Sequence, residues 1–348
     1  MNMLDYQKLA IERVRDHANE KADEYQSYLE QVCRPFHVNV DRLLECVLHR
    51  PVTINFHPDR LANNGKSIME SLIEQGQYHG QFRTGTTNGG KTAFIGGNRF
   101  LWEQRLFHNA YPQLSLDRPK YGALNILRYI DGASARFGSC YIVLKKEIID
   151  RVTFSYGDSS TNPTTLCTKD TFVCVLGELL KDVQNSGKLL NQVVSSEGEA
   201  LAVLLDKCSD LKAIGRNLDY CIEAHIHGDI SLGDDVDCIY MDESFRKTIF
   251  FQQADKLCRQ YGTNLKWIPE RRINVDDIGE LFRGPMIPVI AKRIDALFGD
   301  GRGVLNAALL GQASRDSELH PERWNEFRSE AGVFQYIKQL WHTIAYFG

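Results

Sequence analysis

The segment from Tyr220 to Gly228, which reads YCIEAHIHG, decides the fold. Apolar and polar residues alternate along it, and because successive side chains of a β-strand point to opposite faces, the alternation predicts a strand. The apolar face, which we expect to pack against a hydrophobic core, carries Ile222, Ala224 and Ile226. The other face carries Cys221, Glu223, His225 and His227. We expect these polar side chains to point at solvent or at a ligand, although any half-buried strand with one wet face has the same pattern.

Composition places the chain among globular proteins without a strongly charged surface. It has 348 residues, of which 43% are hydrophobic and 25% charged, enough for one large domain or two modest ones. A formal net charge of -4 gives no broad cationic field, so we expect no nucleic-acid partner. The 9 cysteines are odd in number and form no Cys-x-x-Cys pair, which favours reduced thiols in a cytoplasmic protein over a disulfide framework or a zinc ribbon.

The N-terminal stretch 1–30 is charged throughout and lacks the apolar core of a signal peptide. No run approaches the roughly 20 apolar residues that a membrane helix needs, so we expect no membrane partner. Delivery into another cell by a route that needs no signal peptide stays open.

Helix and strand patterns predict an α+β protein with a mixed, largely antiparallel sheet and helical extensions at both ends. Residues 1–33 contain no Gly or Pro and fit one amphipathic helix that ends before Pro35. Further helices are expected at 41–49, 67–75, 171–214 with interruptions near Gly187 and Gly198, 244–260, 287–298 and 322–346. Further strands are expected at 52–57, 140–144, 152–156 and 236–241, the last as the neighbour of the strand that carries Glu223. The chain then divides into an N-terminal helical region (1–50), a catalytic core (51–245) and a mainly helical C-terminal region (246–348).

The motif FHPDR, from Phe56 to Arg60, stands at the end of a predicted strand, where side chains can leave the sheet and face a cleft. The guanidinium fork of Arg60 can hold phosphate oxygens at two points, and His57 can bond a hydroxyl. The motif therefore suits a phosphate or a ribose. The alternative, which the motif taken alone favours, is a strand-terminal His beside a surface ion pair of Asp59 and Arg60.

A loop rich in Gly and Thr follows at 82–90 and reads FRTGTTNGG. Its glycines allow the backbone to come close to a ligand, and its threonines can fix a neighbouring carboxylate by hydrogen bonds. A plain turn-rich loop has a similar composition.

Residues 85–92 also match the P-loop pattern GxxxxGK[ST], and the segment 239–243 resembles a Walker B strand. A P-loop needs a buried strand before it and a helix that opens at its Lys. Residues 77–83 are too polar for such a strand, and Gly96-Gly97 would interrupt the helix after one turn. Nucleotide hydrolysis therefore stays an alternative only.

His225 and His227 could supply two metal ligands from one strand face, with His57 or Asp229 as a third. No further tight cluster of His and Asp accompanies them in the sequence. We therefore predict no metal site.

Taken in order, these motifs resemble the ADP-ribosyltransferase superfamily, whose toxin-like fold uses NAD+, and in particular a bacterial family of proteins of unknown function assigned to that fold. The resemblance runs from about Thr53 to Asp242 and leaves the helical ends outside. It rests on FHPDR (56–60), QFRTGTTNG (81–89), RPKYGAL (118–124), RFGSC (136–140), Thr153-Phe154 with Gly157-Asp158-Ser159, and Glu223 with HIHG (225–228). Several motifs in a fixed order are more specific than any one of them.

The resemblance implies an early-strand Arg or His that anchors NAD+, a Ser/Thr segment that steadies the site, and a late-strand catalytic Glu. Arg60 or His57 matches the first, Thr84 or Thr86 the second, and Glu223 the third. The other residues expected around NAD+ are Arg83 and Arg136 as phosphate ligands or surface charges, Tyr121 as a stacking face for nicotinamide or a core residue, and Gly85, Asn88 and His225.

One position departs from the family pattern. Arginine-modifying members commonly carry a second carboxylate or amide two residues before the catalytic Glu, where this chain has Cys221. The acceptor is therefore open, with an arginine of a target protein as one option and hydrolysis of NAD+ as another.

The chemistry of NAD+ cleavage agrees with these residues. Breaking the bond between ribose and nicotinamide builds positive charge on the anomeric carbon, and nicotinamide leaves neutral, so one carboxylate can carry most of the catalysis. We predict a mono-ADP-ribosyltransferase that uses NAD+ to modify a target protein, with Glu223 and Thr86 as catalytic residues. A non-enzymatic interaction protein with a vestigial cleft is a further alternative.

Overall fold

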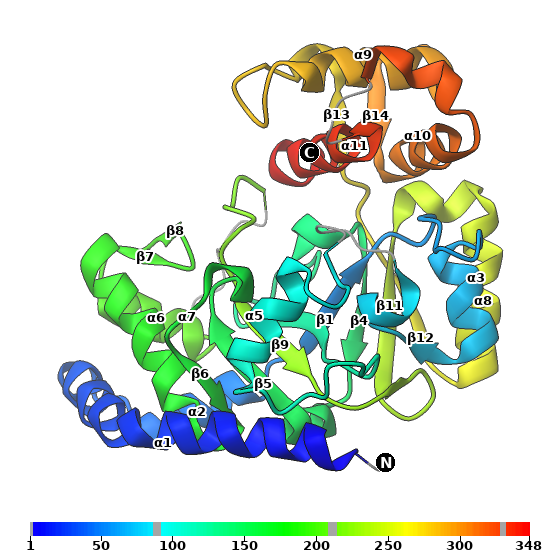
Figure 1. The fold of residues 1–348 in the computed structure, drawn as a ribbon. Coiled ribbons are helices and arrows are strands. Elements are labelled where there is room, and N and C mark those ends of the chain that lie inside the picture. Colours follow the sequence, from blue (N-terminus) through cyan, green and yellow to red (C-terminus); the bar gives the residue numbers. More distant parts are fainter. Residues whose placement is uncertain (1–2, 86–91, 208–213, 328–331) are drawn as a thin grey trace.

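A computed structural model describes residues 3–85, 92–207, 214–327 and 332–348. At its centre lies an eight-stranded sheet with the strand order β12-β11-β4-β1-β3-β9-β5-β6 (Figure 1). The strands are β1 (Val52–Phe56), β3 (Lys120–Leu124), β4 (Cys140–Leu144), β5 (Val152–Tyr156), β6 (Leu166–Thr168), β9 (Ile222–Ile226), β11 (Val236–Asp242) and β12 (Asn264–Ile268). Neighbouring strands pair antiparallel, apart from β11 and β12, which run parallel. The fold is therefore α+β with a largely antiparallel sheet, as the sequence predicts.

The strand β9 lies inside the sheet, between β3 and β5. Glu223 stands opposite Ala123 on one side and Ser155 on the other. The segment 236–241, expected as its neighbour, instead forms β11 and pairs with β4 and β12. That expectation is wrong because nearness in sequence does not fix which strands pair once helices and loops intervene.

Both faces of β9 are buried. Ile222, Ala224 and Ile226 join the hydrophobic core, as the alternation predicts. On the polar face Glu223 is only 8% exposed and His225 is fully buried, so of the two directions expected for this face, bulk solvent is excluded for both side chains. The rings of Phe107 and Tyr121 cover the imidazole of His225, with centroids 5.6 and 5.4 Å away.

The N-terminal region is the predicted long helix α1 (Asp5–Cys33). Its buried apolar side chains recur mostly every four residues and are Ala10, Val14, Ala18, Tyr25, Leu29 and Cys33. The helix packs on α6 (Val173–Ser186) and β6, and Ala10 and Val14 also join a small cluster with Phe107 and Tyr111. Figure 1 shows α1 along the lower edge of the molecule. A 3-10 turn that contains Pro35 follows α1, and α2 (Val40–Leu48) begins after it.

The segment predicted as a helix at 171–214 is divided into several elements. After α6 come a hairpin of β7 (Lys188–Leu189) with β8 (Gln192–Val193), and then α7 (Glu197–Leu204). Gly187 ends α6 with a φ of 66°, a left-handed conformation that glycine adopts without strain. Gly198 lies inside α7 and does not interrupt it. Residues 208–213 lie outside the described part of the chain.

The helices α3 (Ile68–Gln75) and α8 (Ile249–Tyr261) pack together on the side of the sheet that carries β11 and β12 (Figure 1). Ser67 caps α3 by accepting a hydrogen bond from the amide of Glu70, and Gly76 ends it with a φ of 65°. Because β12 belongs to the sheet and α8 contacts it, the core extends beyond the predicted boundary at residue 245.

Smaller elements connect these layers. They are β2 (Gln77–Tyr78), which pairs with β10 (Ile230–Ser231), the helices α4 (Gln81–Thr84) and α5 (Asn98–Leu106), and 3-10 helices at Arg34–Phe36, Ala135–Phe137, Lys146–Arg151, Ser159–Thr161, Lys169–Thr171, Glu243–Lys247, Val275–Asp277 and Pro321–Phe327.

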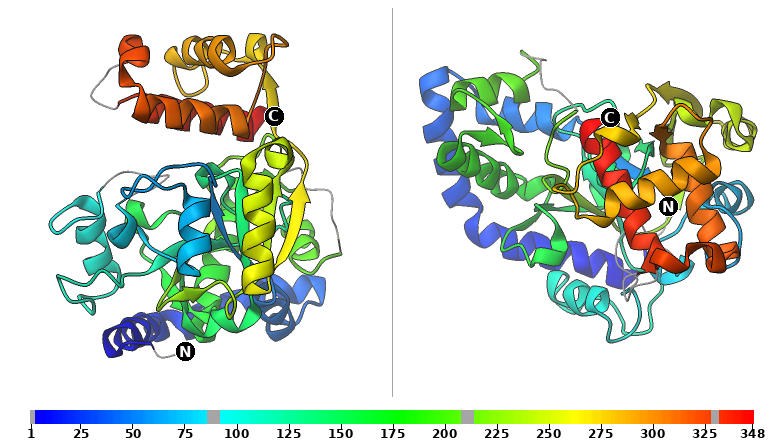
Figure 2. Two further views of the ribbon diagram at one scale, coloured as in Figure 1. Left: turned by 90° about the vertical axis from the view of Figure 1, so that its right-hand side faces the viewer. Right: turned by 90° about the horizontal axis from the view of Figure 1, so that it is seen from above.

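A C-terminal layer lies over one end of the sheet (Figures 1 and 2). It consists of β13 (Arg272–Asn274), α9 (Met286–Phe298), β14 (Val304–Asn306), α10 (Ala307–Leu319) and α11 (Gly332–Phe347). The helix expected at 322–346 is thus a 3-10 segment followed by α11. The indole of Trp341 donates to the carbonyl of Ala135 over 2.8 Å, and Arg60 donates to Ser314, so the layer touches the core at both points. No helix in the described ranges is long and apolar enough to cross a membrane.

Candidate active site

A cavity of about 260 Å³ lies where the sheet, α4, α5 and α11 meet. Residues that are distant in the sequence line it together. Five of them are predicted site residues, namely Arg60, Thr84, Tyr121, Arg136 and Glu223. The structure therefore brings the late-strand carboxylate and the early guanidinium to the same cavity, as the sequence predicts.

The carboxylate of Glu223 is held in place at the cavity wall. The hydroxyl of Ser159 donates to Oε1 over 2.6 Å, and the amide of the same residue donates to Oε2 over 3.2 Å. Nε2 of His225 lies 3.2 Å from Oε1. Both oxygens thus have partners while the residue still lines the cavity, so the carboxylate has one fixed orientation toward a ligand.

Behind Glu223, a chain of buried polar groups runs through the polar face of β9. The hydroxyl of Tyr111 lies 2.6 Å from Nδ1 of His227. Oγ1 of Thr153 lies 3.1 Å from both Nε2 of His227 and Nδ1 of His225. His225 therefore supports Glu223 from behind instead of lining the cavity, which corrects its predicted contact with the ligand.

The protonation states of these groups decide which one donates in each hydrogen bond. Burial raises the pKa of Tyr111 well above its ordinary value, so its hydroxyl keeps its proton and donates to His227. Burial, with His225 next, lowers the pKa of His227, which is therefore neutral and has one N–H left to donate to Thr153. The single hydroxyl proton of Thr153 then goes to Nδ1 of His225. Nε2 of His225 then faces Oε1 of Glu223 at 3.2 Å without meeting hydrogen-bond geometry.

A second buried carboxylate supports the neighbouring part of the wall. Glu103 on α5 is fully buried, accepts a hydrogen bond from the Tyr121 hydroxyl over 2.8 Å, and pairs with Arg118 at 3.1 Å and Arg99 at 4.0 Å. Burial raises the pKa of Glu103, while Arg99 and Arg118 oppose the rise. Arg99 lies over the rings of Tyr121 and of Trp102, which also lines the cavity. Tyr121 thus has a ring at the cavity and an anchored hydroxyl.

Cations outnumber acids among the described residues that line the cavity. The cations are Arg60, Arg99, Lys120, Arg136 and Lys338, and the acids are Asp158 and Glu223. Burial lowers the pKa of Lys120, whose amine donates to the carbonyl of Gly228 over 2.7 Å. An excess of positive charge in a partly enclosed cavity favours an anionic ligand.

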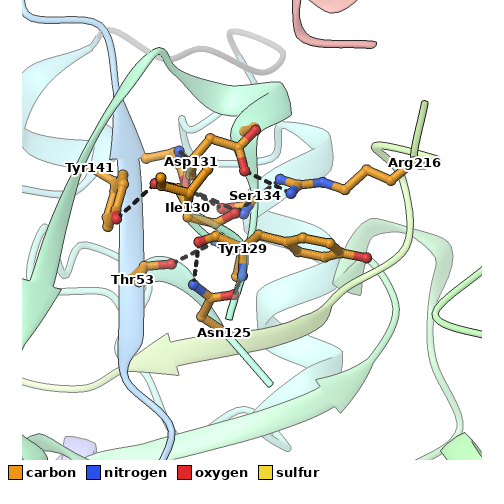
Figure 3. A network of polar contacts seen from close by, with 12 residues as sticks. Thr53, Asn125, Tyr129, Ile130, Asp131, Ser134, Tyr141 and Arg216 are labelled. Carbon is orange, nitrogen blue, oxygen red and sulfur yellow. Dashed lines mark hydrogen bonds and ion pairs between the residues drawn. The ribbon is translucent and has the colours of Figure 1, made fainter. Parts of the chain in front are cut away.

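Polar contacts fix the segment 125–138, which brings Arg136 to the cavity (Figure 3). Arg216 donates to Oδ1 of Asp131 over 2.7 Å, and Arg271 donates to Oδ2 over the same distance. All three of these groups are buried. The guanidinium of Arg136 therefore extends from a rigid support.

The FHPDR motif is divided between the cavity and the interior. Arg60 lines the cavity and donates to Ser314 of α10. His57 is buried behind the wall, where Nδ1 lies 3.3 Å from Oγ of Ser139 and the ring packs edge-on against Trp341. Its predicted contact with the ligand is therefore not formed, because the side chain points to the interface with the C-terminal layer.

Asp59 is also buried, and neither of its carboxylate oxygens has a hydrogen-bond partner among the described residues. Burial raises its pKa to about 6, and the nearby charge of Arg60 opposes the rise. The alternative of a surface ion pair does not describe this motif, since both side chains are only 5% exposed.

The Gly and Thr loop is only partly described. Thr84 lines the cavity, and Gly85 ends α4 with a φ of 61°. Arg83 turns away to pair with Asp117, so it does not supply the predicted phosphate contact. The predicted residues Thr86 and Asn88 lie outside the described ranges.

The flanks of the P-loop-like segment 85–92 differ from those that a P-loop requires. A short helix, α4, precedes it, and among the described residues that follow it, from Thr92 on, the next helix, α5, begins only at Asn98. Asp242, at the end of the Walker B-like strand, is fully buried and accepts from the amides of Ser244 and Arg271. These flanks give no support to nucleotide hydrolysis. Within the described ranges, no group of three or more His, Cys, Asp or Glu is placed to hold a metal ion.

Three residues of the site escape sequence reasoning. Ser159 stands in a quoted motif without an assigned role, and Glu103 and Lys338 lie in helices with no local motif. A Ser beside Asp158 in a Gly- and Ser-containing turn is the only available signal, and it is a weak one. Tertiary contacts alone identify the other two.

The fold and site define an α+β protein with a fixed carboxylate in a cation-lined cavity. Residues 50–347 match the model of a family described as "Protein of unknown function (DUF3626)", and the chain belongs to this family. The match spans both the sheet and the C-terminal layer. A search of curated proteins returned no match.

Proposed function

We propose that the protein is a mono-ADP-ribosyltransferase, a member with its family of the ADP-ribosyltransferase superfamily, which cleaves NAD+ and transfers ADP-ribose to a side chain of a target protein. The observation that carries the proposal is the carboxylate of Glu223, fixed by Ser159 at the wall of a cavity whose lining is cationic. NAD+ presents the two features that this cavity suits, a diphosphate and a sugar carbon that becomes cationic during cleavage.

The cleavage step needs few groups. The bond between the anomeric carbon and the nicotinamide nitrogen breaks, and its electron pair goes to nicotinamide, which leaves neutral. The positive charge that develops on the sugar is stabilised by the carboxylate of Glu223. The acceptor then forms a bond to the anomeric carbon and loses its proton to Glu223 or to water.

The surroundings of Glu223 support this role. Ser159 holds the carboxylate through two hydrogen bonds before a ligand enters, so little reorganisation is required when charge develops. Tyr121, which lines the same cavity, offers an aromatic face for the nicotinamide ring. Burial, with Glu223 next, raises the pKa of the Cys221 thiol, so this cavity residue stays protonated and is a poor nucleophile.

The decisive experiment compares the wild-type protein with Glu223→Gln. Each is incubated with labelled NAD+ and a cell lysate, and the labelled protein and released nicotinamide are measured. We expect the substitution to lower both by at least about 100-fold, the usual scale for loss of a fixed electrostatic group in a transition state. Glu12→Gln is the matched control, because Glu12 is exposed on α1 and does not line the cavity.

Thermal unfolding of Glu223→Gln should match that of the wild-type protein within a few degrees, which separates loss of catalysis from loss of fold. NAD+ should raise the Tm of both proteins by more than ATP does at the same concentration, because ATP lacks the nicotinamide and its ribose. Turnover that survives in Glu223→Gln would exclude this mechanism. If the wild-type protein yields no labelled protein and releases no nicotinamide, the result would favour a non-enzymatic interaction protein.

A further inference from the structure

The helix α11 carries one charged side chain into the cavity. Lys338 lines it, and Trp341, one turn further on the same face, anchors the helix to the core by donating to the carbonyl of Ala135. Ala135 directly precedes Arg136, so Lys338 of the C-terminal layer and Arg136 of the core approach the cavity from a shared attachment point.

The charges around Lys338 are not balanced. Its amine has no hydrogen-bond or ion-pair partner in the described part of the chain, although Arg136 and Arg283 lie near enough to act on its pKa. The two acids of this cluster are already engaged, because Asp219 lies 2.7 Å from Arg136 and 3.6 Å from Arg283, and Asp158 lies 3.8 Å from Arg136.

The remaining members of the cluster do not offset this charge. His342, one turn after Lys338, is buried and has no hydrogen-bond partner at either ring nitrogen among the described residues. Burial, with Arg283 and Arg136 next, lowers its pKa to about 2, so it is neutral. Nε of Arg136 and Nε of Arg283 are likewise buried without a partner. Three cations therefore face two carboxylates, and a bound anion would supply the missing negative charge and hydrogen-bond acceptors.

We propose that Lys338 and Arg136 form a phosphate subsite, so that the C-terminal layer binds the diphosphate of the ligand beside the carboxylate of Glu223. The choice of ligand rests on the proposed function, whereas the phosphate chemistry rests on the cluster alone. The position suits a diphosphate next to the reacting sugar, because Asp158, which contacts Arg136, directly precedes Ser159, which holds Glu223. Guanidinium and ammonium groups bind phosphate oxygens by charge-assisted hydrogen bonds.

Titration calorimetry on the full-length protein tests the subsite directly. ADP-ribose, inorganic pyrophosphate and phosphate-free nicotinamide are each titrated into the wild-type protein, Lys338→Met and Lys338→Arg. We expect Lys338→Met to weaken ADP-ribose and pyrophosphate about tenfold or more, the scale of one charge-assisted hydrogen bond. Lys338→Arg should retain most of the affinity, and the affinity for nicotinamide should be equal in all three proteins.

A second readout separates ligation from a structural role. Burial, with Arg136 and Arg283 next, lowers the pKa of Lys338 to about 8. An anion bound at its amine raises that pKa, so binding at pH 8 should take up roughly half a proton. Titrations in two buffers of different ionisation enthalpy measure this uptake. It should disappear in Lys338→Met and persist in Lys292→Met, because Lys292 is an exposed residue of the same layer.

The outcomes distinguish this inference from the proposed function. Wild-type protein that binds pyrophosphate with proton uptake but does not cleave NAD+ would support the subsite and count against the transferase. Equal affinity of wild-type protein and Lys338→Met for ADP-ribose, or no binding of either phosphate compound to the wild-type protein, would overturn the subsite.

Discussion

Two walls of the cavity differ in how their polar groups are satisfied. On the carboxylate wall, formed by Glu223, Ser159 and Tyr121, both carboxylate oxygens accept hydrogen bonds and the Tyr121 hydroxyl donates one. On the cation wall, formed by Arg60, Arg136 and Lys338, the Nε atoms of both arginines and the Lys338 amine have no partner among the described residues.

The difference shows how each wall can act. A carboxylate that is bonded on both oxygens has a defined position before any ligand arrives, which is the arrangement that transition-state stabilisation requires. Guanidinium N–H groups that are buried without an acceptor are costly to the protein alone, and the cost falls when an anion accepts from them. We therefore expect the carboxylate wall to contribute mainly to catalysis and the cation wall mainly to ligand affinity.

The largest effect should come from removing the buried support of the carboxylate wall. Glu103→Ala leaves Arg118 buried without its carboxylate and takes the acceptor from the Tyr121 hydroxyl. We expect the free energy of unfolding to fall by about 3–5 kcal/mol, measured by chemical denaturation. Glu12→Ala, at an exposed site on α1, should change it by less than about 0.5 kcal/mol. A loss under about 1 kcal/mol for Glu103→Ala would mean that this support is not needed.

The next prediction concerns the pH dependence of stability and a buried histidine, His342, that lies behind the cation wall. Burial lowers the folded-state pKa of His342 to about 2. Below its ordinary pKa of about 6.5, the unfolded chain binds a proton here that the folded protein does not, so this residue costs stability as the pH falls.

His342→Leu removes this cost, because leucine does not titrate. The stability of the variant relative to the wild-type protein should rise by about 1.4 kcal/mol for each pH unit between roughly pH 6 and 4. Denaturant unfolding curves at several pH values measure the slope. A difference between the two proteins that does not change with pH would show that His342 can be protonated in the folded state.

A smaller effect is expected from breaking the chain of polar groups behind Glu223. Thr153→Val keeps the shape of the side chain but removes the hydroxyl that joins His225 to His227. We expect a loss of about 1–3 kcal/mol in stability, since two buried imidazole nitrogens lose their partner. Thr153→Ser, which keeps the hydroxyl, should recover most of this loss. Equal stability of the valine and serine variants would show that the contacts at Thr153 contribute nothing.

The sequence predicts those features that depend on local patterns. The alternation in β9 and the absence of Gly and Pro from α1 each identify an element because the responsible residues are neighbours in the chain. The short strand β12, whose sequence NLKWI alternates polar and apolar residues over only four positions, is missed.

The site is predicted less completely, because burial depends on residues that are distant in the sequence. The pattern of β9 places His225 beside Glu223 but does not reveal that Phe107 covers it. The sequence of α11 likewise does not show that Lys338 enters a cavity, since a single lysine on a helix is ordinarily a surface residue. The carboxylate is predictable from its strand, whereas the cation wall requires the packing of two layers.

Trp102 gives the cavity an optical reporter of its own. Its indole lines the space where a ligand enters, and its ring centroid lies 5.2 Å from the Arg99 guanidinium carbon. The chain has only 4 tryptophans, and Trp324 and Trp341 are buried in the C-terminal layer. Ligand entry changes the environment of Trp102 directly, so its fluorescence can follow occupancy without a label and within the milliseconds of a rapid-mixing experiment.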